Sequence, residues 1–149
     1  MRNTLASGLD QRAVHFWDAL MRQVYVLTGG IIGHRQLGWT FLLLTTIGRK
    51  SGKARTHTLI YLRDGQNLLI VASNNGSEVP PAWYFNLSAH PRVQIQTGRE
   101  KSVYCAKTAT PEERRALWSK LISYHKPFQH HQEKTSREIP VVILTPGDC

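Results

Sequence analysis

The stretch WTFLLLTTIGRKSGKARTHTLIYLRDGQNLLIVA, residues 39–72, decides the fold of this chain. It contains three short apolar runs, and turn-forming residues separate them, which is the pattern of buried β-strands. Asp64-Gly65 predicts a tight hairpin between the second and third runs. The segment Gly48–Arg55, with Ser51-Gly52 at its centre, joins the first two runs in the same way. We therefore predict an antiparallel meander with a cationic loop at one hairpin tip.

The rest of the chain adds strands and helices to this meander. Pro80-Pro81 predicts the start of a helix that must end before Pro91. Thr110 and Glu113 have the spacing of a capping box, with a proline at the first helical position, and predict a second helix. Further short strands are expected at residues 93–97, 102–107 and 141–144. About six strands with helices among them indicate an α+β fold, a small and mostly antiparallel barrel, rather than a doubly wound parallel sheet.

The N-terminal segment predicts an amphipathic helix over about residues 11–27. Apolar side chains recur at helical spacing at Ala13, Phe16, Trp17, Leu20, Met21, Val24 and Leu27. Packing of this face against the core is the favoured interpretation, and contact with a membrane surface is the alternative. Gly29-Gly30 and Gly33 are expected to end the helix and open a turn.

Length and composition indicate a single domain spanning residues 1–149. A chain of this size can bury one core, and its 41% hydrophobic and 19% charged residues are typical of a soluble globular protein. Its apolar runs are too short to span a bilayer and no signal peptide is apparent, so a cytoplasmic location is expected. Cys105 and Cys149 form neither a disulfide framework nor a metal-binding pair, and both are interpreted as having no role.

Positive charge is concentrated in one third of the chain. The formal net charge is +9, and no Asp or Glu occurs between Ala19 and Arg63. Such a field could attract nucleic acid, acidic lipids or a phosphorylated ligand. The four cations Arg49, Lys50, Lys53 and Arg55 lie in the tight loop, where mutual repulsion is unfavourable unless an anion binds. A solvated turn that protects a strand edge is the alternative for this loop.

A second candidate site follows the third strand of the meander. There the buried strand leads into the small polar residues Ser73 and Asn74, whose backbone and hydroxyl groups could face the edge of a planar heterocycle. Trp83 could form an apolar wall nearby, although a plain turn followed by a core tryptophan explains the pattern equally well. The seven histidines lack metal-site spacing, and no nucleotide-binding or hydrolase motif occurs. No metal is expected.

Three stretches together resemble the deazaflavin (coenzyme F-420)-dependent nitroreductase family. They are residues 42–56, residues 71–74 with 81–87, and residues 137–142, and the resemblance runs from about residue 24 to 146. It implies a split β-barrel, FMN-binding-like, and binding of coenzyme F-420, an 8-hydroxy-5-deazaflavin with a phospholactyl and polyglutamate tail. The expected small-molecule partner is an electron-poor acceptor, and the chain is expected to be a monomer or a homodimer, with possible membrane contact through the N-terminal helix.

The resemblance also assigns roles to individual residues. The loop would hold the anionic tail through Arg49, Lys50, Ser51 and Arg55, with Thr56 and His57 adjoining. The ring would lie against Val71, Ala72, Ser73, Asn74, Ala82, Trp83 and Tyr84. Ser73 would polarise the ring edge and Trp83 would shield one ring face.

The chemistry implied is hydride transfer from reduced F-420 to a quinone, enone or nitroaromatic, because a deazaflavin donates hydride and reacts poorly with oxygen. Water or a hydroxyl such as that of Tyr84 or Tyr124 would supply the proton. Some relatives place tyrosines where this chain has His125, Phe128 and His131, so nitro reduction does not follow from the resemblance. These three residues and Tyr124 are the predicted substrate pocket.

Three other functions are compatible with parts of the sequence. FMN also offers a phosphate to a cationic loop, but its short tail suits four cations less well than a long polyanion does. A nucleic-acid binder would explain the charge, yet no recognisable binding motif is present. A carrier or redox sensor would hold the deazaflavin without turnover.

Overall fold

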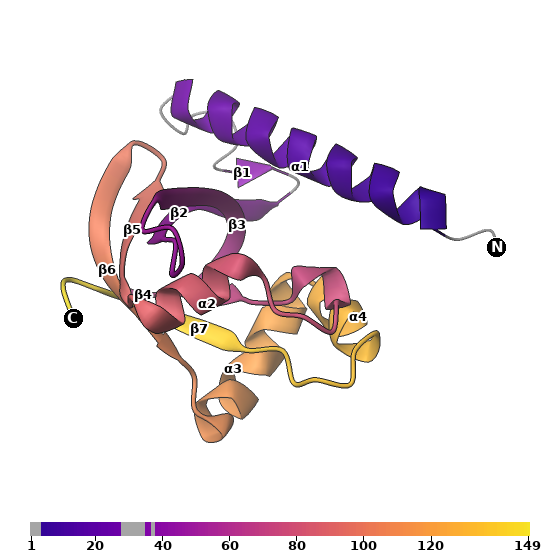
Figure 1. Cartoon of the computed structure of the whole chain (residues 1–149). Helices are drawn as coiled ribbons and strands as arrows, with labels where there is room; N and C mark the ends of the chain where they lie inside the picture. The colour runs from indigo at the N-terminus through magenta and orange to yellow at the C-terminus, as the bar shows by residue number, and fades with distance from the viewer. Residues whose placement is uncertain (1–3, 28–34, 37) are drawn as a thin grey trace.

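The computed structural model describes residues 4–27, 35–36 and 38–149, with side chains described for residues 16–27 and 38–149. The described residues form one long helix and three shorter ones. Figure 1 shows a strongly curved sheet with the long helix along its outside and the shorter helices below it. The turn expected at Gly29, Gly30 and Gly33 lies outside the described residues.

Six antiparallel strands form a closed barrel. They are β2 (Trp39–Ile47), β3 (Ala54–Asp64), β4 (Asn67–Val71), β5 (Arg92–Thr97), β6 (Glu100–Thr108) and β7 (Val141–Pro146). The order is β2-β3-β4-β7-β6-β5, and β5 pairs back onto β2 to close the barrel, while the two-residue β1 (Arg35–Gln36) extends the edge of β2. The predicted antiparallel split barrel of about six strands is confirmed.

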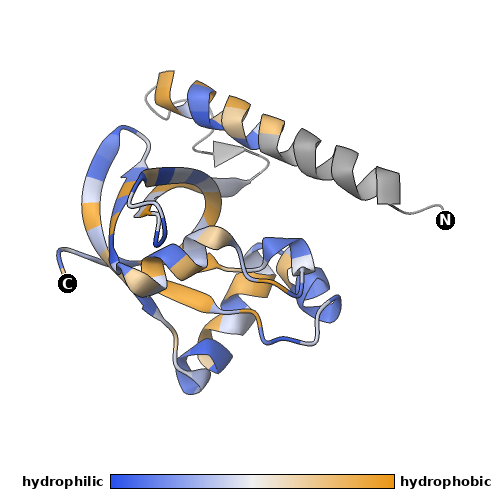
Figure 2. Cartoon of the chain, in the orientation of Figure 1, coloured by the Kyte–Doolittle hydropathy of each residue, from blue (hydrophilic) through white to orange (hydrophobic). Residues whose placement is uncertain are grey.

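Alternating side chains divide the core into an inner and an outer layer. Residues such as Leu44, Ile70 and Leu144 point into the barrel, whereas Val71 and Ile143 belong to a second cluster on its outside. Figure 2 shows apolar residues following the strands and the helices packed on them. The predicted hairpins are present, and each has a glycine with positive φ, at Gly52 (+69°) and Gly65 (+62°).

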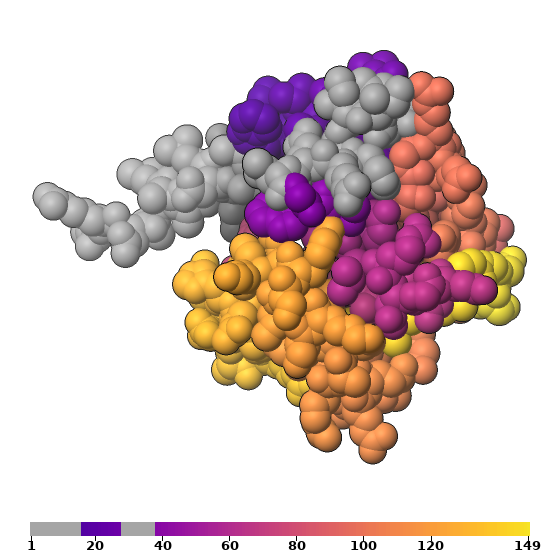
Figure 3. Space-filling view, turned by 180° about the vertical axis from the view of Figure 1, so that it is seen from behind, coloured from indigo at the N-terminus to yellow at the C-terminus, as the bar shows by residue number. Residues whose placement is uncertain are grey.

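Three helices close and cover the barrel. Helix α2 (Ala82–Ala89) inserts Trp83 and Leu87 into the inner cluster. Helix α3 (Pro111–Tyr124) starts with the predicted capping box and, with α4 (Pro127–Glu133), covers the outer cluster. Figure 3 shows these helices (orange) beside the β3–β4 hairpin (magenta), where Lys120 and Asp64 form an ion pair (3.6 Å). A single 3₁₀ turn, η1 (Asn74–Gly76), follows β4.

Helix α1 (Thr4–Leu27) begins earlier than the expected residue 11 and packs differently from the prediction. Phe16 is 68% and Trp17 is 62% exposed, and Leu20 and Leu27 are exposed as well. Tyr25 is buried instead, and its hydroxyl accepts a hydrogen bond from the backbone N–H of Gly98 (2.6 Å). The expected packing is therefore wrong for these exposed residues, whereas Met21 and Val24 of the same face are half-buried. Among the described residues, no helix is long and apolar enough to cross a membrane.

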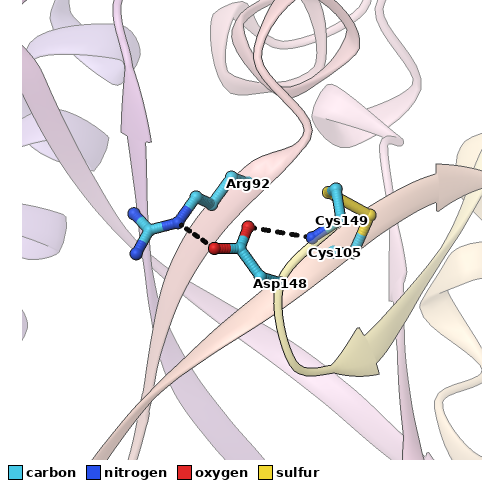
Figure 4. Close-up of a disulfide and its surroundings, with 4 residues drawn as sticks. All are labelled: Arg92, Cys105, Asp148 and Cys149. Carbon is cyan, nitrogen blue, oxygen red and sulfur yellow. Dashed lines mark hydrogen bonds and ion pairs between the residues drawn. A yellow bond between two sulfur atoms is a disulfide. The ribbon is translucent and has the colours of Figure 1, made fainter.

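Cys105 and Cys149 form a disulfide, contrary to the prediction that neither has a role. The chain brings the two residues together from 44 positions apart, because the backbone after β7 pairs with β6 through Gly147 N–H and the Val103 carbonyl (2.9 Å). Figure 4 shows the bond beside an Arg92–Asp148 ion pair (3.1 Å). Sequence spacing could not indicate this pairing, since it depends on the register of the barrel.

The barrel is split between β3 and β4. Within these two strands, which are described in full, the pairing covers only Leu62–Asp64 of β3. On the N-terminal side of Leu62, β3 extends back to the cationic loop, whereas the chain after β4 turns into η1. One edge of β3 from Ala54 to Tyr61 is thus left without a strand neighbour, and α1 lies along it (Figure 1).

Candidate functional site

The cationic loop has a defined backbone shape. Gly48 N–H donates to the Lys53 carbonyl and Gly52 N–H donates to the Gly48 carbonyl, both at 2.8 Å. A Cβ atom at Gly48 would lie 2.5 Å from the Ser51 hydroxyl oxygen and 3.3 Å from the Lys53 carbonyl oxygen, so any larger residue here would displace the Ser51 hydroxyl. The side chains of Arg49, Lys50, Ser51, Lys53 and Arg55 are all exposed. The structure therefore presents the predicted tail-binding residues together, on a closed hairpin tip.

Asn86 of α2 fastens this loop to the helix predicted to hold the ring. Its Oδ1 accepts a hydrogen bond from the Arg49 N–H (3.1 Å), and its Nδ2 donates to the buried Thr46 hydroxyl (3.3 Å). The Arg49 guanidinium also lies over the ring of Phe85, 4.5 Å from the centroid. Two segments that are nearly 40 residues apart thus form one surface. The sequence reasoning missed Asn86, whose polar side chain on an apolar helix was the available signal.

The first residues of β3 line a cleft against α1. The cleft has a volume of about 860 Å³, and its walls are Asp18, Ala19, Arg22, Gln23, Val26, Leu27, Ala54, Arg55, Thr56 and His57. Arg55, Thr56 and His57 were predicted to contact the cofactor, and they lie here, next to the loop. The contribution of α1 to this wall was not predicted.

The predicted ring-binding strand end is held by Arg137. Its Nη2 donates to the carbonyls of Ala72 (3.2 Å) and Ser73 (3.0 Å), and its Nε donates to the Ser77 carbonyl (2.8 Å). The other nitrogen, Nη1, is buried and lacks a hydrogen-bond partner among the described residues. Burial lowers the pKa of Arg137, although the nearby carboxylate of Glu78 acts in the opposite direction. Arg137 was part of the family resemblance, but no role was predicted for it.

Helix α4 brings His131 to Ser73. The Ser73 hydroxyl is 3.1 Å from His131 Nδ1, and Ser73 is 7% exposed. Gly76 permits this close packing, because a Cβ atom there would lie 2.7 Å from the His131 carbonyl oxygen. Burial lowers the pKa of His131, and the positive charges of Lys134 and His130 lower it further. A neutral imidazole that contacts a buried hydroxyl is suited to accept or pass on a proton.

Of the other predicted pocket residues, His125 and Phe128 lie beside His131 and are buried. The His125 ring lies 4.5 Å from those of Phe128 and Trp39, and Phe128 belongs to the outer core cluster. Burial lowers the pKa of His125, and the charge of His131 lowers it further. Tyr124 contacts Thr40 instead, since its hydroxyl accepts the Thr40 N–H at 2.6 Å. Of the predicted substrate pocket, His131 is the residue whose side chain contacts the Ser73 hydroxyl within hydrogen-bond distance.

The predicted ring helix presents its residues unevenly. Ala82 is exposed, and the Tyr84 hydroxyl, 3.1 Å from the Thr108 hydroxyl, lies on the same side as Arg137. Trp83 is only 5% exposed and packs inside the barrel. Its burial agrees with the core-tryptophan alternative and gives no support to the predicted role as a shield over one ring face. No cluster of three metal-binding side chains occurs among the described residues.

Comparison with known proteins assigns the family. Residues 17–146 match the family described as F420H(2)-dependent quinone reductase. A protein of Mycobacterium tuberculosis (strain ATCC 25618 / H37Rv) with that name is 41% identical over 127 residues, which cover 82% of this chain and 85% of the relative.

Two solved structures are similar to this chain in sequence and fold. One, titled an F420-H2 dependent reductase, is 36% identical with a TM-score of 0.65, and the match covers 70% of this chain and 92% of that one. The other, titled a domain-swapped dimer, is 31% identical with a TM-score of 0.68, and the match covers 85% and 96% of the two chains.

The predicted resemblance to deazaflavin-dependent enzymes is therefore confirmed, as are the predicted cofactor, coenzyme F-420, and the class of enzyme, an oxidoreductase. The exposed cations of the loop are the chemistry that an anionic cofactor tail requires. The chain belongs to the F420H(2)-dependent quinone reductase family.

Proposed function

We propose that this chain reduces a quinone with coenzyme F-420, and that the surface joining the cationic loop to the Ser73 strand end holds the cofactor. The observation that carries the proposal is the Asn86 bridge, since it fixes the tail-binding loop against the ring-binding helix. The name of the family and of the M. tuberculosis relative supports a quinone as acceptor. Enones and nitroaromatics are further candidate acceptors, because they are also electron-poor.

The residues present fit a deazaflavin with a long anionic tail. Arg49, Lys50, Lys53 and Arg55 offer charge-assisted hydrogen bonds to the phosphate and carboxylates. At the other end of the site, Arg137 Nη1 is a buried donor with no partner among the described residues, and a carbonyl of the heterocycle would satisfy it. Ser73 lies next to that donor.

When bound, reduced F-420 supplies a hydride from carbon 5 of its ring, and a quinone that takes up this hydride needs one further proton. Ser73 holds a proton at Oγ in contact with His131 Nδ1, so the two residues can deliver or replace it. The Tyr84 hydroxyl is the second candidate donor. Tyr124 is a poorer candidate proton donor than the sequence implied, because its hydroxyl is hydrogen-bonded to the backbone N–H and the hydroxyl of Thr40.

A direct assay tests the proposed reaction. Purified protein and reduced F-420 are mixed with a soluble naphthoquinone, and the absorbance of oxidised F-420 is followed. We expect turnover that depends on both the protein and the quinone. Tight F-420 binding without turnover of quinone, enone or nitroaromatic would favour a carrier or sensor. Tighter binding of FMN than of F-420 would favour the flavin alternative.

The predicted membrane contact of α1 remains a proposal, and the exposed apolar residues of that helix support it. Phe16, Trp17 and Leu20 are exposed, lie outside the wall residues of the cleft and belong to a chain of net charge +9, a combination suited to an anionic membrane surface. Sedimentation with anionic vesicles tests this. Binding should fall when Phe16 and Trp17 are both replaced by Ser, and equal binding of that variant would rule the helix out as the contact. Monomer or homodimer likewise remains a prediction.

A further inference from the structure

Helix α1 takes the place of a missing strand neighbour along β3. The Arg22 Nη1 atom donates to the Thr56 carbonyl (3.0 Å), and the backbone N–H of Thr58 hydrogen-bonds to the Asp18 carboxylate. Asp18 and Arg22 are four residues apart, so both project from the same side of the helix. The Thr56 carbonyl and the Thr58 N–H, on the open edge of β3, thus have hydrogen-bond partners in the side chains of α1 rather than in another strand.

This docking creates the cleft of about 860 Å³ that adjoins the cationic loop. Arg22 forms part of one wall, and Arg55 forms part of the opposite wall. A guanidinium carries five N–H groups, and the bond to Thr56 uses one of those on Arg22. Since residues 49–53 form the loop and residues 54–57 line the cleft, the two cationic surfaces are continuous along the chain.

Asp18 is the acidic side chain of this cleft. Its carboxylate lies 3.9 Å from His57 Nδ1. Burial raises the pKa of Asp18, but the hydrogen bond and charge of His57, the Thr58 N–H and the charge of Arg22 together lower it below its ordinary value. The titratable and charged groups lining the cleft are therefore Asp18, Arg22, Arg55 and His57, and the first of these repels anions at neutral pH.

We propose that Arg22 and Arg55 form a second anion-binding point, which holds the glutamate carboxylates of the F-420 tail after the loop has bound its phosphate. Asp18 limits the affinity of this point by repulsion, and α1 becomes one wall of the cofactor site. This inference rests on the proposed function, because it assumes that the loop binds the tail. It adds a cation from α1, Arg22, to the cations that the loop offers to the tail.

The test exploits the opposite charges of two residues that make the same kind of contact. Arg22→Gln removes a cation from the cleft, whereas Asp18→Asn removes an anion and keeps an oxygen that can accept the Thr58 N–H. Arg115→Gln on the exposed part of α3 is the matched control, since it also removes one positive charge, but from outside the cleft. Fluorescence polarisation measures the Kd of F-420 for each variant, and far-UV circular dichroism checks that each is folded.

We expect Arg22→Gln to raise the Kd by about 3- to 10-fold, because the variant loses one charged hydrogen bond to the tail, whose strength solvent screening reduces. Asp18→Asn should lower the Kd by about 2- to 5-fold, because a nearby like charge is gone. Arg115→Gln should change it less than about 2-fold. The effects of Arg22→Gln and Asp18→Asn should disappear with the deazaflavin chromophore that lacks the phospholactyl group and glutamates.

Other outcomes overturn the inference. If Arg22→Gln and Asp18→Asn weaken binding alike, α1 has only a structural role at β3. If both leave the Kd unchanged but raise the KM for quinone, the cleft holds the acceptor instead. In these cases wild-type protein still binds F-420, so the proposed function stands, whereas failure of the wild type to bind F-420 removes both proposals.

Discussion

Replacing Asn86 by Ala tests whether the loop and the ring helix act as one site. The substitution removes the bonds to Arg49 N–H and to the Thr46 hydroxyl, and Thr46 is fully buried. Two lost hydrogen bonds and one buried hydroxyl without a partner cost about 2–3 kcal/mol of unfolding free energy. For a domain of this size, that cost lowers the melting temperature by about 4–10 °C.

The same substitution should weaken cofactor binding. With the Arg49 backbone no longer fixed, the loop must be ordered when the anion binds, and we expect the Kd for F-420 to rise by about 3- to 10-fold. Asn86→Asp is the matched control for stability, because a carboxylate still accepts the Arg49 N–H and can accept the Thr46 hydroxyl proton.

Urea unfolding and fluorescence polarisation on the two variants separate the effects. Asn86→Asp should retain most of the stability yet bind F-420 more weakly than the wild type, since it places a negative charge beside the anion site. The reasoning is refuted if Asn86→Ala unfolds within about 0.5 kcal/mol of the wild type and binds F-420 with unchanged Kd.

Three further predictions concern other parts of the molecule. Gly76→Ala should lower the unfolding free energy by about 2 kcal/mol or more, because φ is +81° and the new Cβ would meet the His131 carbonyl oxygen. Gly98→Ala is the control, since φ is +61° there but the surrounding space is open, and it should lower the unfolding free energy measured by urea titration by only about 1 kcal/mol. Equal losses in the two variants would count against the close packing at Gly76. The unfolding free energy should fall as pH drops below about 6.5, because folding lowers the pKa of His125 and of His131, so the unfolded chain binds more protons than the folded one. Calorimetry across pH 5–8 should show that the unfolding free energy of His125→Phe depends less steeply on pH than that of the wild type. An equal dependence on pH would contradict the argument that His125 is buried in its neutral form. Cys149→Ser should lower the unfolding free energy by up to about 4 kcal/mol, because it opens a closed loop whose ends are 44 positions apart in the sequence. A wild-type mass that shows two free thiols after non-reducing purification would contradict the disulfide.

Local patterns in the sequence were enough to predict the barrel. The glycines at the two hairpins and the capping box of α3 determine the backbone within a few residues, so a short stretch of sequence is enough to predict these features. The families of inward and outward apolar residues follow directly from strand alternation. The predicted loop and the Ser73 strand end were therefore placed correctly on their elements.

Long-range contacts could not be predicted in this way. Asn86 meets the loop 37 residues away, and Arg137 holds a strand end about 64 residues away, so neither role has a local signature. Helix α4 is short and mostly polar, which hid the approach of His131 to Ser73. The docking of α1 depends on the open edge of β3, and a helical apolar stripe alone suggested the opposite face.

The most direct test of the central claim is a titration of F-420 against the wild type, Arg49→Ala and Arg55→Ala, followed by fluorescence polarisation, with FMN as the competing ligand. We predict that the wild type binds F-420 more tightly than FMN and that each substitution raises the F-420 Kd by about tenfold, the equivalent of one charged hydrogen bond. Unchanged affinity in both variants, or tighter binding of FMN, would contradict the assignment of the loop to the anionic tail of F-420.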